Sequence, residues 1–373
     1  MRRALTIYVI LCFSTCCLLA QQVKIGNYAF PGGGEYQGEM LRGKPYGQGK
    51  TTYPNGDYHE GEYVKGKRQG RGTYQFADGE KYEGEWYQDQ QHGEGVYYFA
   101  NNNRYEGLWF RDYQQGEGTM YYYNGDTYVG GWIQDKRDGE GRYTFAQNGA
   151  YYEGHWKNDM KDGHGVFDWK DGNRYEGNWR ENKKSGKGTF TYATGDSYTG
   201  DWSNDQQHGR GIFVFHDGNR YEGQYVHGQR TGEGIYLFAN GDKYVGHFAN
   251  GEQEGTGTFT WHTGAFYTGQ WHHNKQHGTG KYRWANGDEY DGGWVDGLLD
   301  GEGVLRQADG VKFKGTFRQG LKEGKGILED ADGIRYEGNF SADKKDGEFI
   351  EKDKDGVLLR KVTYKDGIPV NNP

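Results

Sequence analysis

One short pattern recurs along almost the whole of this 373-residue chain at a nearly fixed spacing. It consists of an aromatic residue, a glycine two residues later and a second aromatic two residues after that, as in Tyr82, Gly84 and Trp86. The glycine of this motif stands at positions 38, 61, 84, 107, 130, 154, 177, 200, 223, 246, 269, 292, 315 and 338. Neighbouring copies are 23 residues apart, except for one interval of 24. A fixed period of this length over many copies predicts a solenoid or array.

Each copy has the pattern of a β-hairpin. The aromatic, glycine and second aromatic share one face of a first strand, because side chains alternate along a β-strand. We expect a loop of five or six residues, as at 157–162, and then a second strand of the form G-x-G-x-aromatic. The copy ends in Asn-Gly-Asp or a relative of it, as at 55–57, and Asn-Gly favours a type I′ turn. Consecutive strands therefore join at both ends.

The composition indicates how such hairpins hold together. The chain has 67 Gly, 33 Tyr, 18 Phe and 11 Trp, whereas all hydrophobic residues amount to only 33%. Disordered chains are poor in aromatics, so we expect an ordered sheet in which each glycine leaves a slot that a ring from the next strand fills. The predicted aromatic ladder comprises Tyr82, Trp86, Tyr105, Trp109, Tyr128, Trp132, Tyr152, Trp156, Tyr175, Trp179, Tyr198 and Trp202.

Several copies depart from the pattern, and three of these departures bear on the fold. His59 takes the place of the first tyrosine in the second copy. The one inserted residue predicts a bulge or a longer turn near Gln147 and Asn148. The turn at 101–103 is Asn-Asn-Asn and lacks glycine.

The first twenty residues differ from the rest. Arg2 and Arg3 precede an uncharged, largely apolar stretch at 4–20, and the polar chain opens at Gln21. This form predicts a secretory signal peptide that is cleaved after Ala20, and hence a secreted protein or one at a membrane surface. An uncleaved membrane anchor is the alternative, and acylation at Cys12, Cys16 or Cys17 comes third.

Charge and cysteine content exclude several classes of protein. Removal of residues 1–20 takes away two arginines and no acid, which changes the net charge from −8 to −10. A net acidic chain does not favour nucleic-acid binding. All three cysteines lie in the first 17 residues, so the repeats have no disulfides and no thiolate metal ligands.

The 23-residue unit resembles the MORN repeat (membrane occupation and recognition nexus). The resemblance covers nearly all of the chain beyond residue 34. It implies an all-β fold, an elongated, twisted, single-layer antiparallel sheet of tandem hairpins. It also implies roles in scaffolding, self-association, and attachment to membranes or cytoskeleton. We divide the chain into the signal peptide or anchor at 1–20, a lead-in at 21–34, fourteen repeats at 35–357, and a C-terminal cap strand and tail at 358–373.

The motifs that resemble catalytic or metal-binding sites all belong to the repeat. Residues 185–189 read Ser-Gly-Lys-Gly-Thr, which lacks the Ser or Thr that a phosphate-binding loop needs directly after its lysine. His272, His273 and His277 are a weak candidate for a metal site, because His92 and His208 stand at the same repeat position as His277. Paired glutamates of a glycoside hydrolase are the weakest possibility, since the glutamates recur along the array. We therefore expect no catalytic residues, no cofactor and no metal.

Two functions remain. The leading hypothesis is a non-enzymatic scaffold that binds protein partners or itself. The alternative is a peripheral module that binds anionic membranes or phosphoinositides through basic hairpin loops. The candidate lipid contacts are Lys65, Lys67, Arg68, Lys136, Arg137, Arg180, Lys183 and Lys184.

Overall fold

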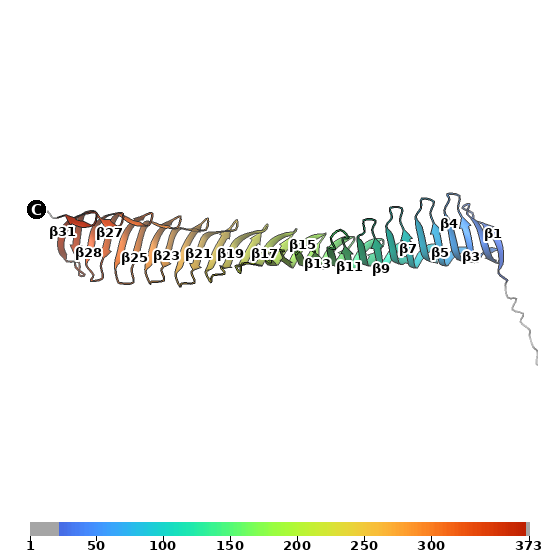
Figure 1. The fold of residues 1–373 in the computed structure, drawn as a ribbon, viewed down its shortest axis with the longest axis horizontal. Coiled ribbons are helices and arrows are strands. Elements are labelled where there is room, and N and C mark those ends of the chain that lie inside the picture. The colour runs from blue at the N-terminus through green and yellow to red at the C-terminus, as the bar shows by residue number, and fades with distance from the viewer. Residues whose placement is uncertain (1–21, 371–373) are drawn as a thin grey trace, which may run out of the picture. The chain divides into compact units, whose positions relative to one another are not determined.

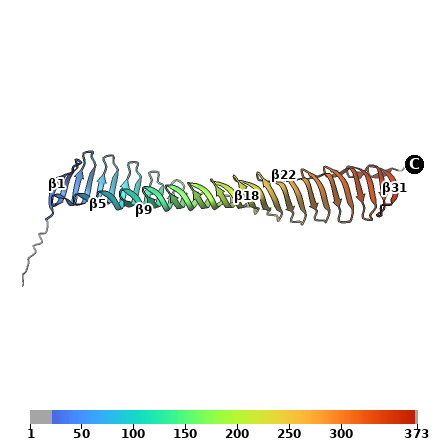
Figure 2. The same cartoon turned by 180° about the vertical axis from the view of Figure 1, so that it is seen from behind.

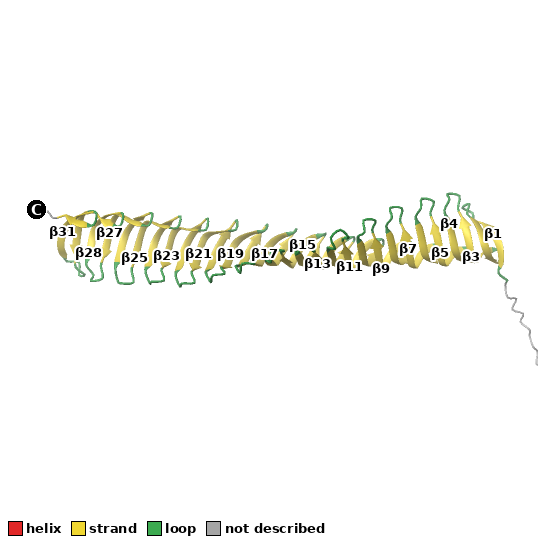
Figure 3. Ribbon diagram, viewed as in Figure 1, coloured by secondary structure: helices red, strands yellow, loops and turns green. Residues whose placement is uncertain are grey.

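The computed structural model describes residues 22–370, so the predicted signal peptide lies outside the described residues. These residues form 32 β-strands and no helix. Figure 3 shows the strands in yellow. No helix that could cross a membrane occurs between residues 22 and 370. The chain divides into two compact units, residues 22–147 with 157–159 and residues 148–156 with 160–370.

The hairpins of unit 1 follow one another in chain order, from blue to green in Figure 1. Each strand pairs antiparallel with the next. The strands are β1 Lys24–Ala29, β2 Glu35–Leu41, β3 Lys44–Thr52, β4 Tyr58–Val64, β5 Lys67–Gln75, β6 Lys81–Tyr87, β7 Gln90–Tyr98, β8 Arg104–Phe110, β9 Tyr113–Tyr121, β10 Thr127–Ile133 and β11 Lys136–Thr144.

Unit 2 repeats the same hairpin, and Figure 2 shows its order from green to red. Its strands are β12 Tyr151–Lys157, β13 Met160–Asp168, β14 Arg174–Arg180, β15 Lys183–Thr191, β16 Ser197–Ser203, β17 Gln206–Val214, β18 Arg220–Val226, β19 Gln229–Leu237, β20 Lys243–Ala249, β21 Glu252–Thr260, β22 Phe266–His272, β23 Lys275–Arg283, β24 Glu289–Val295, β25 Leu298–Arg306, β26 Lys312–Arg318, β27 Leu321–Glu329, β28 Arg335–Ser341, β29 Lys344–Lys345, β30 Gly347–Lys352, β31 Leu358–Lys365 and β32 Ile368–Val370. Residue 157 is the last residue of β12, although it belongs to unit 1.

The strand register places glycine opposite glycine. Between β6 and β7, Tyr82 faces Tyr97 and Gly84 faces Gly95, after which a bulge shifts the register. The ring that covers Gly95 is that of Tyr82, since a Cβ on this glycine would clash with the tyrosine hydroxyl. The prediction that a ring from the next strand fills the glycine slot was therefore wrong for this glycine and its equivalents, because their ring comes from the preceding strand. It holds for Gly338, which the ring of Phe349 on the following strand covers.

The two kinds of turn are the reverse of those predicted. Asn158 and Asp159 alone connect β12 to β13, and both have positive φ, at 47° and 68°, as a two-residue type I′ turn requires. The prediction of a loop of five or six residues at this position was therefore wrong. The connection between β3 and β4 instead has a three-residue loop, 54–56, closed by a hydrogen bond from Tyr53 to the carbonyl of Asp57. Gly56 has a φ of 92° and donates to the carbonyl of Tyr53. That geometry is a type I turn followed by a left-handed glycine.

The departures from the repeat change the backbone only locally. Asn102 takes the left-handed position of the missing glycine, with a φ of 64°, and asparagine tolerates this region better than most residues. The inserted residue lengthens the turn at 146–148, as predicted. Four strands exceed the 28 expected from fourteen hairpins: β1 precedes the repeats, β31 and β32 follow them, and the last second strand is divided into β29 and β30.

Candidate functional site

The aromatic face of the sheet is its core. Tyr82 meets Trp86 and Trp109 edge to face, at ring-centroid distances of 5.2 and 5.4 Å. The hydroxyl of Tyr82 donates to the carbonyl of Glu85 at 2.9 Å, and burial raises its pKa. None of the twelve ladder residues is more than 6% exposed. The ladder thus stabilises the sheet and is not available to a partner.

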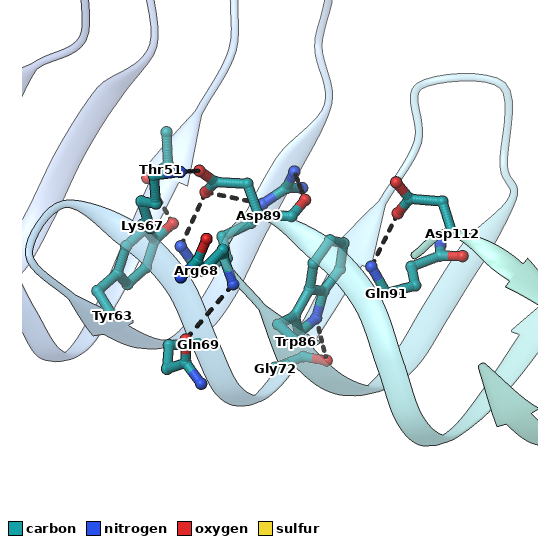
Figure 4. A network of polar contacts seen from close by, with 11 residues as sticks. Thr51, Tyr63, Lys67, Arg68, Gln69, Gly72, Trp86, Asp89, Gln91 and Asp112 are labelled. Carbon is teal, nitrogen blue, oxygen red and sulfur yellow. Dashed lines mark hydrogen bonds and ion pairs between the residues drawn. The ribbon is translucent and has the colours of Figure 1, made fainter. Parts of the chain in front are cut away.

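Three of the candidate lipid-contact residues lie on this aromatic face. The guanidinium of Arg68 lies 4.1 Å from the ring centroid of Trp86, and Arg137 pairs with Asp159 at 3.0 Å. The ammonium group of Lys184 lies 4.5 Å from the ring of Trp202, and burial lowers its pKa. Figure 4 shows Arg68 beside Trp86 and Asp89. These cations stack on the rings of their own sheet.

The other five candidate lipid contacts are exposed at the edge that carries the type I′ turns. They are Lys65, Lys67, Lys136, Arg180 and Lys183. Within unit 1, the turn of Lys65 and that of Lys136 are six strand spacings apart, which corresponds to about 29 Å at the usual strand spacing. This exceeds the Debye length of about 8 Å in physiological salt, so the structure does not gather these cations into one patch.

Lys161 is a stacked cation that the sequence analysis did not identify. Its ammonium group lies 4.1 Å from the ring centroid of Trp179, and burial lowers its pKa to about 8. It stands at the repeat position of Arg68, Arg137 and Lys184. Alignment of the copies at this position would have shown that these cations belong to the aromatic face.

The polar face of unit 2 carries a groove of about 1030 Å³. Its floor contains paired glycines such as Gly200 and Gly211. Its sides carry charges of both signs, and Lys187 and Glu176 are already paired with neighbours, Asp201 and Arg174, at 2.7 Å. The groove therefore has a mixed, solvated lining.

The polar face of unit 1 exposes apolar side chains at one repeat position in consecutive hairpins, whereas in unit 2 an exposed valine holds that position only in two separate hairpins, at Val226 and Val295. The last residue of the first strand in successive hairpins is Val64, Tyr87, Phe110 and Ile133, with exposed fractions of 40, 49, 47 and 48%. We call these four residues the apolar row. The corresponding residues in the next three hairpins, which belong to β12, β14 and β16, are Lys157, Arg180 and Ser203.

Two further features border the apolar row. Leu108 is 41% exposed on the same strand face, and Glu94 stands directly opposite it on β7. The ring of His92 links Tyr87 to Phe110, with centroid distances of 5.5 and 5.2 Å. Sequence reasoning missed this surface, although an apolar residue at one repeat position in five consecutive copies, from Leu41 to Ile133, was its signal.

The three clustered histidines are close in space but each has its own environment. His272 and His273 have ring centroids 4.1 Å apart, and they pair with Glu254 and Glu252 respectively. His277 lies 5.5 Å from His272. Over residues 22–370, no group of three or more histidine, cysteine or acidic side chains is placed to hold a metal ion.

A profile of the MORN repeat matches fourteen consecutive segments of the chain. The matched residues are 36–58, 59–81, 82–104, 105–127, 128–150, 152–174, 175–197, 198–220, 221–243, 244–266, 267–289, 290–312, 313–335 and 336–348. They cover most of the sequence and coincide with the hairpins described above.

Comparisons with curated proteins and with solved structures add no information about function. A search of curated proteins finds no match. Among solved structures, the TCP domain of Drosophila melanogaster SAS-4, in complex with a proline-rich motif of Ana2, is 16% identical with a TM-score of 0.28, over 48% of this chain and 90% of that one. The TCP10 domain of Danio rerio CPAP, in complex with a STIL peptide, is 12% identical with a TM-score of 0.19, over 77% and 96%. TM-scores this low carry no information about the partners of this chain.

Proposed function

Because this chain belongs to the MORN-repeat family, we propose that it is a non-enzymatic scaffold that binds protein partners, or a second copy of itself, through exposed surfaces of its sheet. The repeat accounts for every glycine-rich and glutamate-rich motif that otherwise resembles a catalytic site. The proposal depends on surface features that the repeat does not require.

The apolar row is the observation that carries the proposal. The aromatic core lies on the opposite face, so the fold does not need apolar side chains at these positions. Exposed apolar residues that form a contiguous patch rimmed by polar groups mark interaction sites. Tyrosine and phenylalanine are also enriched where protein interfaces are most buried. A protein partner that covers Tyr87 and Phe110 would remove these rings from water.

Chemical crosslinking of the full chain in its native setting tests this proposal. Lys65, Lys67 and Lys136 are exposed beside the apolar row and can react with an amine-specific crosslinker. We expect mass spectrometry to find these lysines joined to another protein, or to a second copy when differently labelled copies are mixed. Crosslinks scattered evenly over all exposed lysines would contradict the proposal.

The second candidate is a peripheral membrane function through the exposed loop cations. Each basic residue near an anionic membrane contributes about 1 kcal/mol, but the wide spacing of Lys65 and Lys136 and the net charge oppose it. We expect weak or absent flotation with phosphoinositide vesicles. Strong flotation that is lost when Lys65, Lys67, Lys136 and Lys183 become Gln would favour the membrane function. Arg68 and Lys184 are left intact because their stacking on tryptophan stabilises the sheet.

We also propose that the chain enters the secretory pathway by means of residues 1–20. The two arginines, the uncharged stretch and the Ala20–Gln21 junction support this. Sequencing of the mature N-terminus is expected to start near Gln21. Intact Met1 in a membrane fraction would favour the anchor, and intact Met1 in the cytosol would refute both.

A further inference from the structure

A hollow of about 630 Å³ lies on the aromatic face of unit 1. Its lining includes Phe99, Tyr122 and two aspartates, Asp112 and Asp135. It occurs where the row of second-strand rings is interrupted, because Met120 stands at the position of Tyr97 and Tyr143. The smaller, flexible methionine leaves space that a ring fills in the neighbouring hairpins.

The flanking hairpins show what normally occupies this part of the face. Arg68 stacks on Trp86 and donates to the backbone carbonyl of Asp89 at 2.6 Å, as Figure 4 shows. Three copies later, Arg137 makes the same contact with the carbonyl of Asp159 at 3.0 Å. In each case a guanidinium fits between the rings and the aspartate of the next turn.

The two hairpins between them keep the aspartates and lose the cations. Gln91 and Gln114 stand at the arginine position, and their backbone N–H groups still donate to Asp112 and Asp135 at 2.8 and 2.7 Å. Figure 4 shows the first of these bonds. Among residues 22–370, neither of these two aspartates has an ion-pair partner within 4 Å, whereas Asp89 and Asp159 do.

The glutamine side chains can also reach a ligand. Gln91 and Gln114 are only 7 and 4% exposed and line the hollow. Their side-chain amides make no hydrogen bond to any residue of the described chain, and the amide atoms themselves are not fully buried. A ligand with several donors would satisfy the amide oxygens and the carboxylates together.

We propose that this hollow binds an arginine side chain of a partner protein. This inference rests on the proposed scaffold function and names a chemical feature of the partner. Asp112, Asp135 and Asp159 contribute three carboxylates and Arg137 one cation, so the hollow is negatively charged. A guanidinium stacks on aromatic rings and offers five donors in a planar fork. It would take the place that Arg68 and Arg137 fill in the flanking hairpins.

The test is a titration of the full chain with N-acetyl-arginine amide, observed through the indole signals of ¹⁵N-labelled tryptophan. Trp109 and Trp132 line the hollow and are expected to shift in a saturable way. N-acetyl-citrulline amide has the same shape without the charge, and we expect it to bind at least about tenfold more weakly, since a desolvated cation–π contact and a charged hydrogen bond are both lost.

Substitutions in the chain test whether the arginine probe binds in this hollow. Replacement Q91R with Q114R supplies the chain's own cations, and we expect it to abolish binding. The matched control Q276R makes the same change in unit 2 and should leave binding intact. Thermal unfolding of each variant verifies the fold, and stability is expected to be retained because the chain already uses arginine at this position. Replacement D112N with D135N should weaken binding at least about fivefold.

Three results would overturn the inference: no tryptophan shift, equal binding of citrulline, or undiminished binding in the Q91R/Q114R variant. Saturable binding of a neutral disaccharide in place of arginine would also overturn it. The scaffold function is tested separately, because crosslinks at the apolar row do not involve the hollow. If those crosslinks form while the arginine probe fails, only this inference is wrong.

Discussion

One histidine occupies a position that a neutral tyrosine takes in the adjoining hairpins. His59 is completely buried, and its ring meets those of Tyr63 and Trp86 at 5.3 and 5.0 Å. Neither ring nitrogen has a hydrogen-bond partner among the described residues. Burial, with a smaller contribution from the charge of Arg68, lowers its pKa to about 3. The folded chain therefore holds this imidazole neutral.

We predict that His59→Tyr makes the chain more resistant to acid. Below the ordinary histidine pKa of about 6.5 the unfolded state binds a proton that the folded state rejects, so wild-type stability falls as the pH decreases toward 3. The loss relative to the variant amounts to about 1.4 kcal/mol per pH unit. Above pH 6.5 the difference is constant. Urea unfolding at pH 7 and pH 4.5 measures it.

Histidine 164 supplies the control, because it is exposed. His164→Tyr makes the same chemical change at this exposed position and controls for the effect of the substitution itself. Equal loss of stability between pH 7 and pH 4.5 in wild type and His59→Tyr would refute the buried, neutral imidazole.

At the scale of the hairpin, the type I′ turns connect successive repeats as well as strands. The carboxylate of Asp89 accepts the backbone N–H of Arg68, 21 residues earlier, at 2.9 Å, and also lies 3.7 Å from the arginine Nε. Asp89 has a φ of 74°. Asn182 and Asn274 accept the same backbone bond in other hairpins. The side-chain oxygen at this turn is thus the common element.

We therefore predict opposite results for two substitutions at this turn. Asp89→Ala removes the acceptor and puts a Cβ-bearing residue without a local hydrogen bond at positive φ, which should lower the free energy of unfolding by about 1–3 kcal/mol. Asp89→Asn keeps both the acceptor and the tolerance of this conformation and should change it by less than about 1 kcal/mol. Chemical denaturation of the two variants distinguishes them. An equal loss would assign the effect to the exposed ion pair instead.

The hairpins themselves could be predicted because the repeat and the alternation of Tyr, Gly and Trp leave few other folds. The turn types could not, since Asn-Gly is compatible both with a type I′ turn and with a type I turn followed by a left-handed glycine at Gly56. The surfaces proposed to bind partners could not be predicted from the sequence either. Whether Arg68 points to solvent or onto Trp86 depends on packing between repeats, which no single copy of the motif specifies.

At the scale of the whole molecule, the repeats differ in their exposed residues and agree in their core. The buried ladder is nearly identical from copy to copy, whereas the last residue of the first strand changes from Tyr87 and Phe110 in unit 1 to Arg180 and Ser203 in unit 2. The two units thus expose different residues, although each has the same kind of aromatic core. Because neighbouring repeats supply the packing, exposed positions are free to vary with the partner.

The most direct test of the scaffold function is the loss of crosslinks when the apolar row is removed. Tyr87→Ser with Phe110→Ser changes two exposed rings outside the core, and we expect normal thermal unfolding but few crosslinks from Lys65, Lys67 and Lys136. The matched control changes Val226 and Val295, which hold the same repeat position in unit 2 and are 46 and 44% exposed, to Ser. That control should crosslink as the wild type does. Unchanged crosslinking in the Tyr87 and Phe110 variant would contradict the account.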